Sequence, residues 1–140
     1  MALSASSLKV GDSRTEVVAE NLSRTQIVQY AGASGDYNPL HSDELYVTKV
    51  AGFPTVFAHG MLTMGLTGRI ITDWAGVESL LSYGARFEKQ VWPGDTLTAT
   101  ATVEAIEDGD DGKVAKFTVV TVNEAGDRVL SATASARLDP

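Results

Sequence analysis

The sequence predicts an α+β fold in which an antiparallel sheet near the C-terminus covers a central helix. Three observations predict it: polar and apolar residues alternate strictly over residues 96–105, the inward faces of this segment and of residues 129–138 are rich in alanine, and a glycine-containing apolar stretch precedes both segments. The 140 residues, 44% of them hydrophobic and 21% charged, are expected to form a single domain over residues 1–140. A chain of this length buries roughly two thirds of its unfolded surface, so it needs neither a metal nor a disulfide to hold a core.

Two short helices are expected in the first part of the chain. Ser23 is a suitable N-cap for a helix over residues 24–33, because its hydroxyl can accept from a backbone N–H of the first turn, and Gly35 is a suitable stop. A shorter helix is expected over about residues 42–50.

Residues 59 to about 74 are expected to form the central helix. This segment is apolar on most sides rather than along one stripe. It contains Gly60, Gly65 and Gly68. Each glycine lowers the helix propensity by about 1 kcal/mol relative to alanine, so the surroundings have to hold the helix. We therefore expect a buried helix that neighbouring backbone approaches closely.

Four strands are expected after this helix, over residues 80–88, 96–105, 114–122 and 129–138. Turn signals separate them at residues 92–95, 108–112 and 123–127. Small residues recur on the inward faces of two strands, at Ala99, Ala101, Ala105, Ala132, Ala134 and Ala136. Because protein interiors leave little empty volume, something bulky has to lie against these faces, and the central helix fits there.

Composition and charge exclude several functions. Eleven Lys and Arg against 18 Asp and Glu give a net charge of −7, which argues against a nucleic-acid binder. The lack of cysteine excludes disulfides and thiolate catalysis. No run approaches the roughly 18 apolar residues of a membrane-spanning helix, so no membrane association is expected. The first ten residues lack the features of a secretory leader, which favours a cytoplasmic location.

The segment from Asp36 to His41 is the strongest candidate for chemistry. Pro39 disfavours helical backbone at Asn38, so the chain is expected to bend there and can aim a carboxylate and an imidazole at one point. An imidazole exchanges protons near neutral pH, and a carboxylate beside it can orient it or act as the complementary acid. Asn38 adds an amide that both donates and accepts. The alternative is an ordinary loop in which Asp36 and Asn38 serve only as turn formers.

His59 and Gly60 stand at the expected start of the central helix. A histidine in this position is more often a hydrogen-bonded structural residue than a catalytic one. The Gly60 N–H would lack an intrahelical acceptor, and the helix dipole adds partial positive charge there. It could therefore stabilise a thioester carbonyl that develops negative charge. The alternative for Gly60 is close packing alone.

The stretch YAGASGDYNPLHSDELYVTKVAGFPTVFAHGMLT, residues 30–63, resembles the hydratase 2 motif region of MaoC-like dehydratases. These belong to the hot-dog superfamily, which includes (R)-specific enoyl-CoA hydratases. The resemblance rests on the GDYNPLH core at residues 35–41 and the AHGM string at residues 58–61, and the WPGD turn at residues 92–95 is like one common in the family. The nearest likeness is to the catalytic B-type subunit of actinobacterial (3R)-hydroxyacyl-ACP dehydratases.

The resemblance implies a single hot-dog fold in which the sheet encloses the central helix. It implies that Asp36 and His41 form a catalytic dyad and that Asn38 orients the site. The Gly60 N–H would bind the thioester carbonyl, and His59 stays mainly structural.

The implied activity is that of a hydro-lyase in fatty acid metabolism. Trans-2-enoyl thioesters of CoA or ACP would be hydrated reversibly to (R)-3-hydroxyacyl thioesters. No metal, flavin or nicotinamide cofactor is expected, and CoA or phosphopantetheine enters only as part of the substrate. The resemblance also implies a homodimer with sheets joined edge to edge, which hides an edge strand; a heterodimer with an A-type dehydratase subunit is the other implied assembly.

Two further functions stay open, because one fold hosts several chemistries. A hot-dog acyl-CoA thioesterase is one, although the Asp36-x-Asn38-Pro39-x-His41 spacing argues against it. A non-catalytic acyl-thioester-binding subunit is the other, and it would normally lack the dyad. Four cations are candidates for contacts with substrate phosphates, with solvated surface charge as the simpler interpretation of each: Arg86, Lys89, Lys113 and Lys116.

Overall fold

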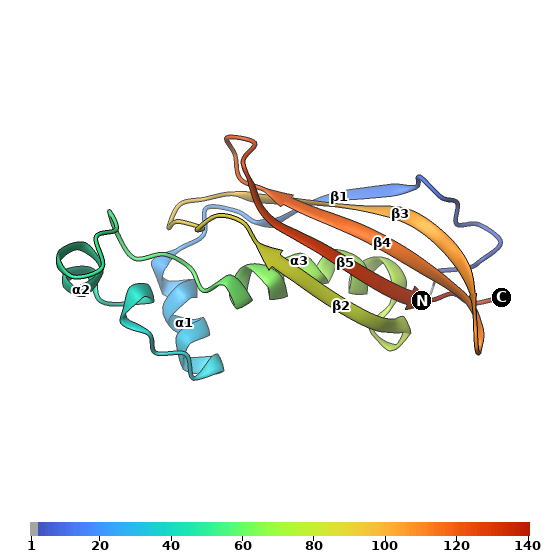
Figure 1. Cartoon of the computed structure of the whole chain (residues 1–140), viewed down its shortest axis with the longest axis horizontal. Helices are drawn as coiled ribbons and strands as arrows, with labels where there is room; N and C mark the ends of the chain where they lie inside the picture. Colours follow the sequence, from blue (N-terminus) through green and yellow to red (C-terminus); the bar gives the residue numbers. More distant parts are fainter. Residues whose placement is uncertain (1–2) are drawn as a thin grey trace.

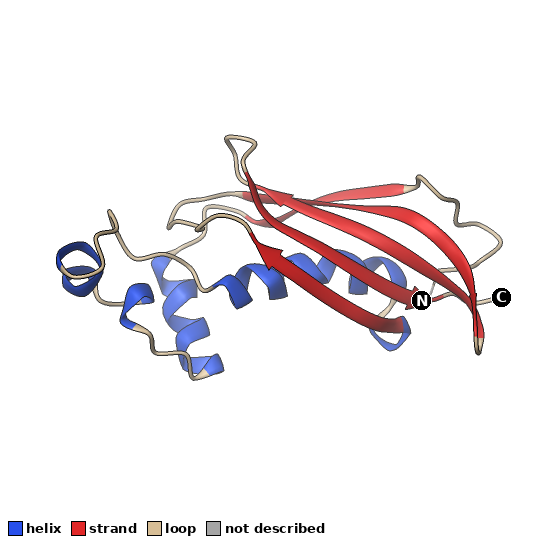
Figure 2. Cartoon of the chain, viewed as in Figure 1, coloured by secondary structure: helices blue, strands red, loops and turns tan. Residues whose placement is uncertain are grey.

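Five antiparallel strands form one curved sheet that lies over the long helix α3 (Figure 1, Figure 2). The computed structural model describes residues 3–140. In chain order the elements are β1 (Ser13–Ala19), α1 (Arg24–Ser34), η1 (Pro39–His41), α2 (Glu44–Lys49), α3 (Gly60–Ala75), η2 (Val77–Ser79), β2 (Leu80–Phe87), β3 (Leu97–Gly109), β4 (Gly112–Val122) and β5 (Arg128–Arg137). The strand order is β1-β3-β4-β5-β2, which confirms the predicted α+β hot-dog architecture.

The four predicted strands correspond to β2 to β5. The hairpin between β3 and β4 is tighter than expected, because the pairing continues to Gly109 and Gly112. Strand β1 was not predicted. It pairs antiparallel with β3 at the sheet edge and has a register shift between Val17 and Ala19.

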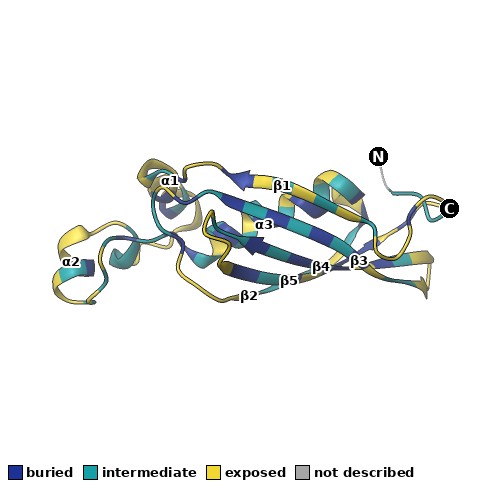
Figure 3. Ribbon diagram, turned by 90° about the horizontal axis from the view of Figure 1, so that it is seen from above, coloured by how far each residue is buried: buried dark blue, intermediate teal, exposed yellow. Residues whose placement is uncertain are grey.

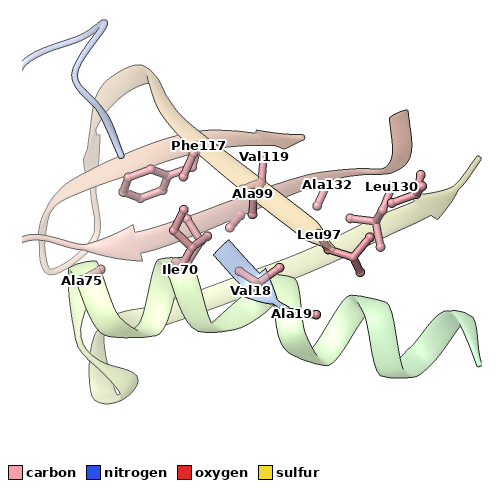
Figure 4. Packing of buried hydrophobic residues seen from close by; sticks show 14 of the residues in the cluster. Val18, Ala19, Ile70, Ala75, Leu97, Ala99, Phe117, Val119, Leu130 and Ala132 are labelled. Atoms are coloured by element: carbon pink, nitrogen blue, oxygen red, sulfur yellow. The ribbon is translucent and has the colours of Figure 1, made fainter. Parts of the chain in front are cut away.

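The inward faces of the central strands pack on α3, as predicted. Buried and partly buried residues alternate along these strands (Figure 3). Ala99 and Ala132 lie above the helix, and Ile70 of α3 points up between them and Phe117 (Figure 4). Burying a side chain such as Ile70 contributes about 1.5–3 kcal/mol. The small alanines thus leave the volume that the helix fills.

Two of the three helix glycines face aromatic side chains of β2, so the expectation of close backbone approach was wrong. A Cβ on Gly60 would lie 3.0 Å from ring atoms of Phe87, and a Cβ on Gly68 would lie 3.0 Å from Tyr83 Cε1. Gly65 is exposed and has nothing within 4 Å of that position. Glycine at two positions therefore admits aromatic rings of the edge strand.

A helical extension, which we define as residues 24–49, lies beyond the end of the sheet near the first turn of α3 (Figure 1). Its helix α1 begins as predicted at Ser23, whose hydroxyl accepts from the Gln26 N–H in a capping box. It ends as predicted at Gly35, which has the left-handed φ of 75°. The extension thus carries the Asp36–His41 segment to one end of α3.

Within residues 3–140, no helix combines the length and apolarity needed to cross a bilayer.

Candidate active site

The predicted bend is present between α1 and η1. Asn38 has extended backbone (φ −55°, ψ 126°), as a residue before proline prefers, and Pro39 then starts η1. The Asp36 carboxylate accepts from the Asn38 N–H over 3.2 Å. The Asn38 side-chain oxygen accepts from the Leu40 N–H over 3.0 Å. Asn38 therefore shapes the bend as the cap of η1, and its proposed part in the chemistry stays a prediction.

His41 is held in one tautomer by the backbone of Phe57. Its Nδ1 lies 2.6 Å from the Phe57 carbonyl oxygen. A carbonyl can only accept, so Nδ1 carries the hydrogen and the neutral ring keeps a bare Nε2. Burial lowers the pKa of His41 from the usual 6.5, and the nearby charge of His59 lowers it further. The hydrogen bond with Phe57 and the charge of Asp36 act in the opposite direction. The imidazole is therefore suited to accept a proton near neutral pH.

The structure brings Asp36 and His41 together, as predicted. One ligand atom from each, and one from His59, lie within 4.8 Å of one another. Two hydrogen bonds of about 2.8 Å span up to about 5.6 Å, so one water can bridge the carboxylate and the imidazole. Asp36 is exposed, whereas His41 is half-buried.

His59 lies directly against this pair, which the sequence did not indicate. Its side chain is 1% exposed, and its Nε2 lies 3.0 Å from the Asp36 carbonyl oxygen. Its ring stacks on that of His41, with centroids 3.8 Å apart and planes 26° apart. The edge of Tyr30 closes another side at 4.8 Å.

One carboxylate and two imidazoles also raise the question of a metal ion. An ion bound by an imidazole lies close to the plane of the ring, along a nitrogen lone pair. In-plane lone pairs of the stacked His41 and His59 rings do not converge on a common point between the rings. The stacking therefore disfavours one ion held by both histidines.

Gly60 is the first residue of α3 and faces a cavity. The His59 carbonyl accepts from the N–H groups of Leu62 and Thr63. Within residues 3–140, no protein acceptor meets the Gly60 N–H. The cavity beside it has a volume of about 250 Å³ and is lined by Phe57, Gly60, Thr63, Phe87, Val91 and Val129, among others. Glu88, Lys89 and Gln90 also line it, so the pocket has apolar and polar parts. Such a pocket with the residue of a free helix N–H in its lining suits an acyl thioester.

Of the four candidate cations, the structure places one at this cavity. Lys89 lines it and forms an ion pair with Asp127 over 3.2 Å. Lys113 is paired with Asp108, away from the cavity. Arg86 and Lys116 line other hollows of the molecule.

Comparison with known proteins identifies the family of this chain. The model of the MaoC like domain family matches residues 6–125. The chain is 46% identical over 68 residues to 3-hydroxyacyl-thioester dehydratase Y of Mycobacterium tuberculosis, which covers 46% of this chain and 23% of that protein. It is 35% identical over 101 residues to the (R)-specific enoyl-CoA hydratase of Rhodospirillum rubrum, which covers 71% of this chain and 68% of that protein.

A solved structure matches along nearly the whole chain. The ChsH1-ChsH2 complex from Mycobacterium tuberculosis has 27% identity and a TM-score of 0.75, covering 94% of this chain and 98% of the matched chain. The chain spans 23% of the length of dehydratase Y, so the match to that protein concerns one segment of it. Because the family model covers most of the sequence and the fold agrees, this chain belongs to the family of MaoC-like domains.

Proposed function

We propose that this chain is a hydro-lyase that adds water to trans-2-enoyl thioesters, giving (R)-3-hydroxyacyl thioesters, and that catalyses the reverse dehydration. The observation that carries the proposal is the Phe57 bond, which leaves the Nε2 of His41 without a hydrogen in a ring that lies close to the Asp36 carboxylate. The names of the relatives, an (R)-specific enoyl-CoA hydratase and a 3-hydroxyacyl-thioester dehydratase, support both directions of the reaction and its stereochemistry.

Binding begins at the first turn of α3. The thioester carbonyl accepts from the Gly60 N–H, and the acyl chain enters the adjoining 250 Å³ cavity. As water adds, negative charge develops on the carbonyl oxygen. The free N–H and the positive end of the helix dipole stabilise that charge more than they stabilise the neutral substrate, which lowers the barrier.

Asp36 and His41 hold the attacking water between them. The oxygen of the water bonds to C3, and the proton that it loses passes to the dyad. The dyad then returns a proton to C2, so it ends in its starting state and the product carries one added water. The pKa of His41 lies below the usual value, so its imidazole is neutral at neutral pH and available to accept a proton. The mechanism uses no metal and no redox cofactor.

The substrate carrier is CoA or an acyl carrier protein, with Lys89 at the cavity rim as the cation placed to meet a phosphate. A cytoplasmic location is part of the same proposal.

Association with a second hot-dog chain is part of the proposal. Strand β2 pairs only with β5, so its other edge has no partner strand within residues 3–140. Leu81 and Phe87 of this strand are 54% and 51% exposed. The solved ChsH1-ChsH2 complex is an assembly of two different chains, which supports a heterodimer, and a second copy of this chain would satisfy the same edge.

The test follows crotonyl-CoA by its enoyl absorbance together with an assay for free thiol. Loss of the enoyl signal without thiol release supports hydration, and thiol release indicates a thioesterase. The absence of both changes favours a binding subunit. Asp36→Asn and His41→Gln are each expected to lower turnover by about 10²-fold or more. Asp110→Asn, at the exposed tip of the β3–β4 hairpin, is the matched control. Near-normal turnover in either dyad variant would reject the proposed dyad.

A further inference from the structure

His59 contacts both members of the proposed dyad. Its Nε2 is 3.0 Å from the Asp36 carbonyl oxygen, which can only accept, so Nε2 carries the hydrogen. Its ring lies flat on the His41 ring at a centroid distance of 3.8 Å. His59 immediately precedes Gly60 and is the N-cap of α3. One buried side chain therefore links the dyad to the helix end that would bind the thioester.

The bond to Asp36 fixes the backbone that carries the carboxylate. Asp36 is exposed, and the contacts of its own segment are short-range, with Ser34 and Asn38. The His59 bond joins this exposed bend to a residue 23 positions later in the chain. Without it, the bend would be held near α3 by two contacts with Phe57, the bond from the His41 ring to the Phe57 carbonyl and the bond from the Phe57 N–H to the Leu40 carbonyl.

The stacked ring fixes the plane of the His41 imidazole. A single bond at Nδ1 leaves a ring free to tilt about the donor direction. The face of His59 on one side and the edge of Phe57, at 5.3 Å, restrict that tilt. The direction of the His41 Nε2 lone pair is thereby set before substrate arrives.

Packing alone does not account for a histidine here. The Nδ1 of His59 is buried and meets no hydrogen-bond partner among residues 3–140. A phenylalanine would fill the same space without an unpaired polar atom, whose burial opposes folding. Unlike phenylalanine, histidine provides an Nε2–H here, which donates to the Asp36 carbonyl.

We propose that His59 is a positioning residue for the dyad, acting through its Nε2–H bond to the Asp36 carbonyl and its stack on His41. Its effect on catalysis rests on the proposed hydratase function. The bond itself does not rest on that function.

The bond is tested first, without substrate. The chain has two histidines, so ¹⁵N-histidine labelling with a His59 variant for assignment resolves both rings. We expect opposite tautomers at pH 7.5: Nε2–H at His59 and Nδ1–H at His41. An Nδ1–H tautomer at His59 would overturn the proposal, whether or not the protein hydrates enoyl thioesters.

The consequence for turnover is tested with two variants that separate the bond from the ring. His59→Phe keeps an aromatic face on His41 but removes the donor. His59→Gln keeps an N–H donor that can reach the Asp36 carbonyl. We expect kcat to fall at least ~10-fold in His59→Phe with KM changed less than ~3-fold, and His59→Gln to retain more of kcat than His59→Phe. Tyr30→Phe keeps the ring edge against His59 and is the control expected to retain wild-type kcat.

Unchanged kcat in folded His59→Phe, or a His59→Gln variant no better than it, would overturn the positioning role. If His59→Phe does not fold, the kcat of His59→Gln decides. A fall in its kcat as large as that of His41→Gln would overturn the proposal, and a kcat within ~10-fold of wild type would support it. If the wild type has no hydratase activity, the proposed function fails, while the tautomers still decide the bond.

Discussion

The ring of Tyr83 on β2 occupies the space beside Gly68 on α3. Tyr83 Cε1 lies 3.0 Å from the position of a Cβ on Gly68, and the Tyr83 hydroxyl donates to the Met64 carbonyl over 2.6 Å. Burial raises the pKa of Tyr83 to about 12, so the hydroxyl remains a donor at neutral pH. The edge strand β2 is thus joined to α3 at Gly68, because glycine is the one residue type that leaves room there for an aromatic ring.

Gly68→Ala is expected to destabilise the protein, because the hydrogen bond to Met64 keeps the Tyr83 ring from moving away freely. We expect the free energy of unfolding to fall by about 1–3 kcal/mol, as for overpacked cores. Gly65→Ala is the matched control in the same helix, with nothing within 4 Å of the new methyl group. It should raise the free energy of unfolding by about 0.5–1 kcal/mol. Urea denaturation of both variants checks this, and equal effects would contradict the assigned contact.

Gly60→Pro and Gly60→Ala together isolate the proposed oxyanion donor. Both side chains bring a Cβ against the Phe87 ring, but only proline removes the N–H. Proline is tolerated at the first position of a helix, and His59 already has the extended backbone that a following proline needs (φ −59°, ψ 134°). We expect kcat of the proline variant to be about 10²-fold below that of the alanine variant. Similar kcat values in steady-state kinetics would exclude the Gly60 N–H from catalysis.

The hydroxyls of Thr67 and Thr121 form a buried hydrogen bond between α3 and β4, with a distance of 2.7 Å. Replacing one threonine by valine leaves the other hydroxyl buried without its partner, which costs about 1–3 kcal/mol. The double variant should recover most of that loss, because no unpaired hydroxyl remains. A double-mutant cycle by chemical denaturation measures the coupling. Strictly additive losses would show that the two hydroxyls act independently.

The lowered pKa of His41 predicts the acid side of the pH profile. The neutral imidazole persists below pH 6.5, so the acid limb of kcat/KM is expected to have its midpoint below 6.5. The unfolded chain binds this proton more readily than the folded one, so the contribution of His41 to stability is lost as pH falls below 6.5. Urea midpoints at pH 7.5 and 5.5, compared between wild type and His41→Gln, measure this contribution. A limb with its midpoint above 6.5 would contradict the effect of burial.

Local patterns in the sequence predicted most of the fold. Alternation identified β3 and β5, a high content of Val, Thr and Phe identified β4, and Ser23 and Gly35 marked both ends of α1, because the responsible interactions are short-range. Strand β1 escaped prediction because it is an edge strand with charged Arg14 and Glu16, and its register shift breaks the alternation. The rings that face the helix glycines were also missed, since they belong to a strand that is distant in sequence.

The same distinction between short-range and tertiary interactions applies to the site. The convergence of Asp36 and His41 followed from a bend within six residues, which Pro39 indicates directly. The stack of His59 on His41 depends on where the first turn of α3 meets the helical extension. That is a tertiary relationship, so no local pattern encodes it. The hydrogen bond from the Leu40 N–H to the Asn38 side-chain oxygen depends on a side-chain rotamer, which the motif also does not specify.

The proposed acyl cavity and the proposed proton-transferring groups come from different parts of the chain. Phe87 and Val129 line the cavity from the sheet side, whereas Asp36 and His41 belong to the helical extension. Phe57 connects the two parts, because it lines the cavity and its carbonyl accepts from the His41 ring. Redesign of acyl-chain preference can therefore alter Phe87 or Val129 and leave the machinery for moving protons untouched.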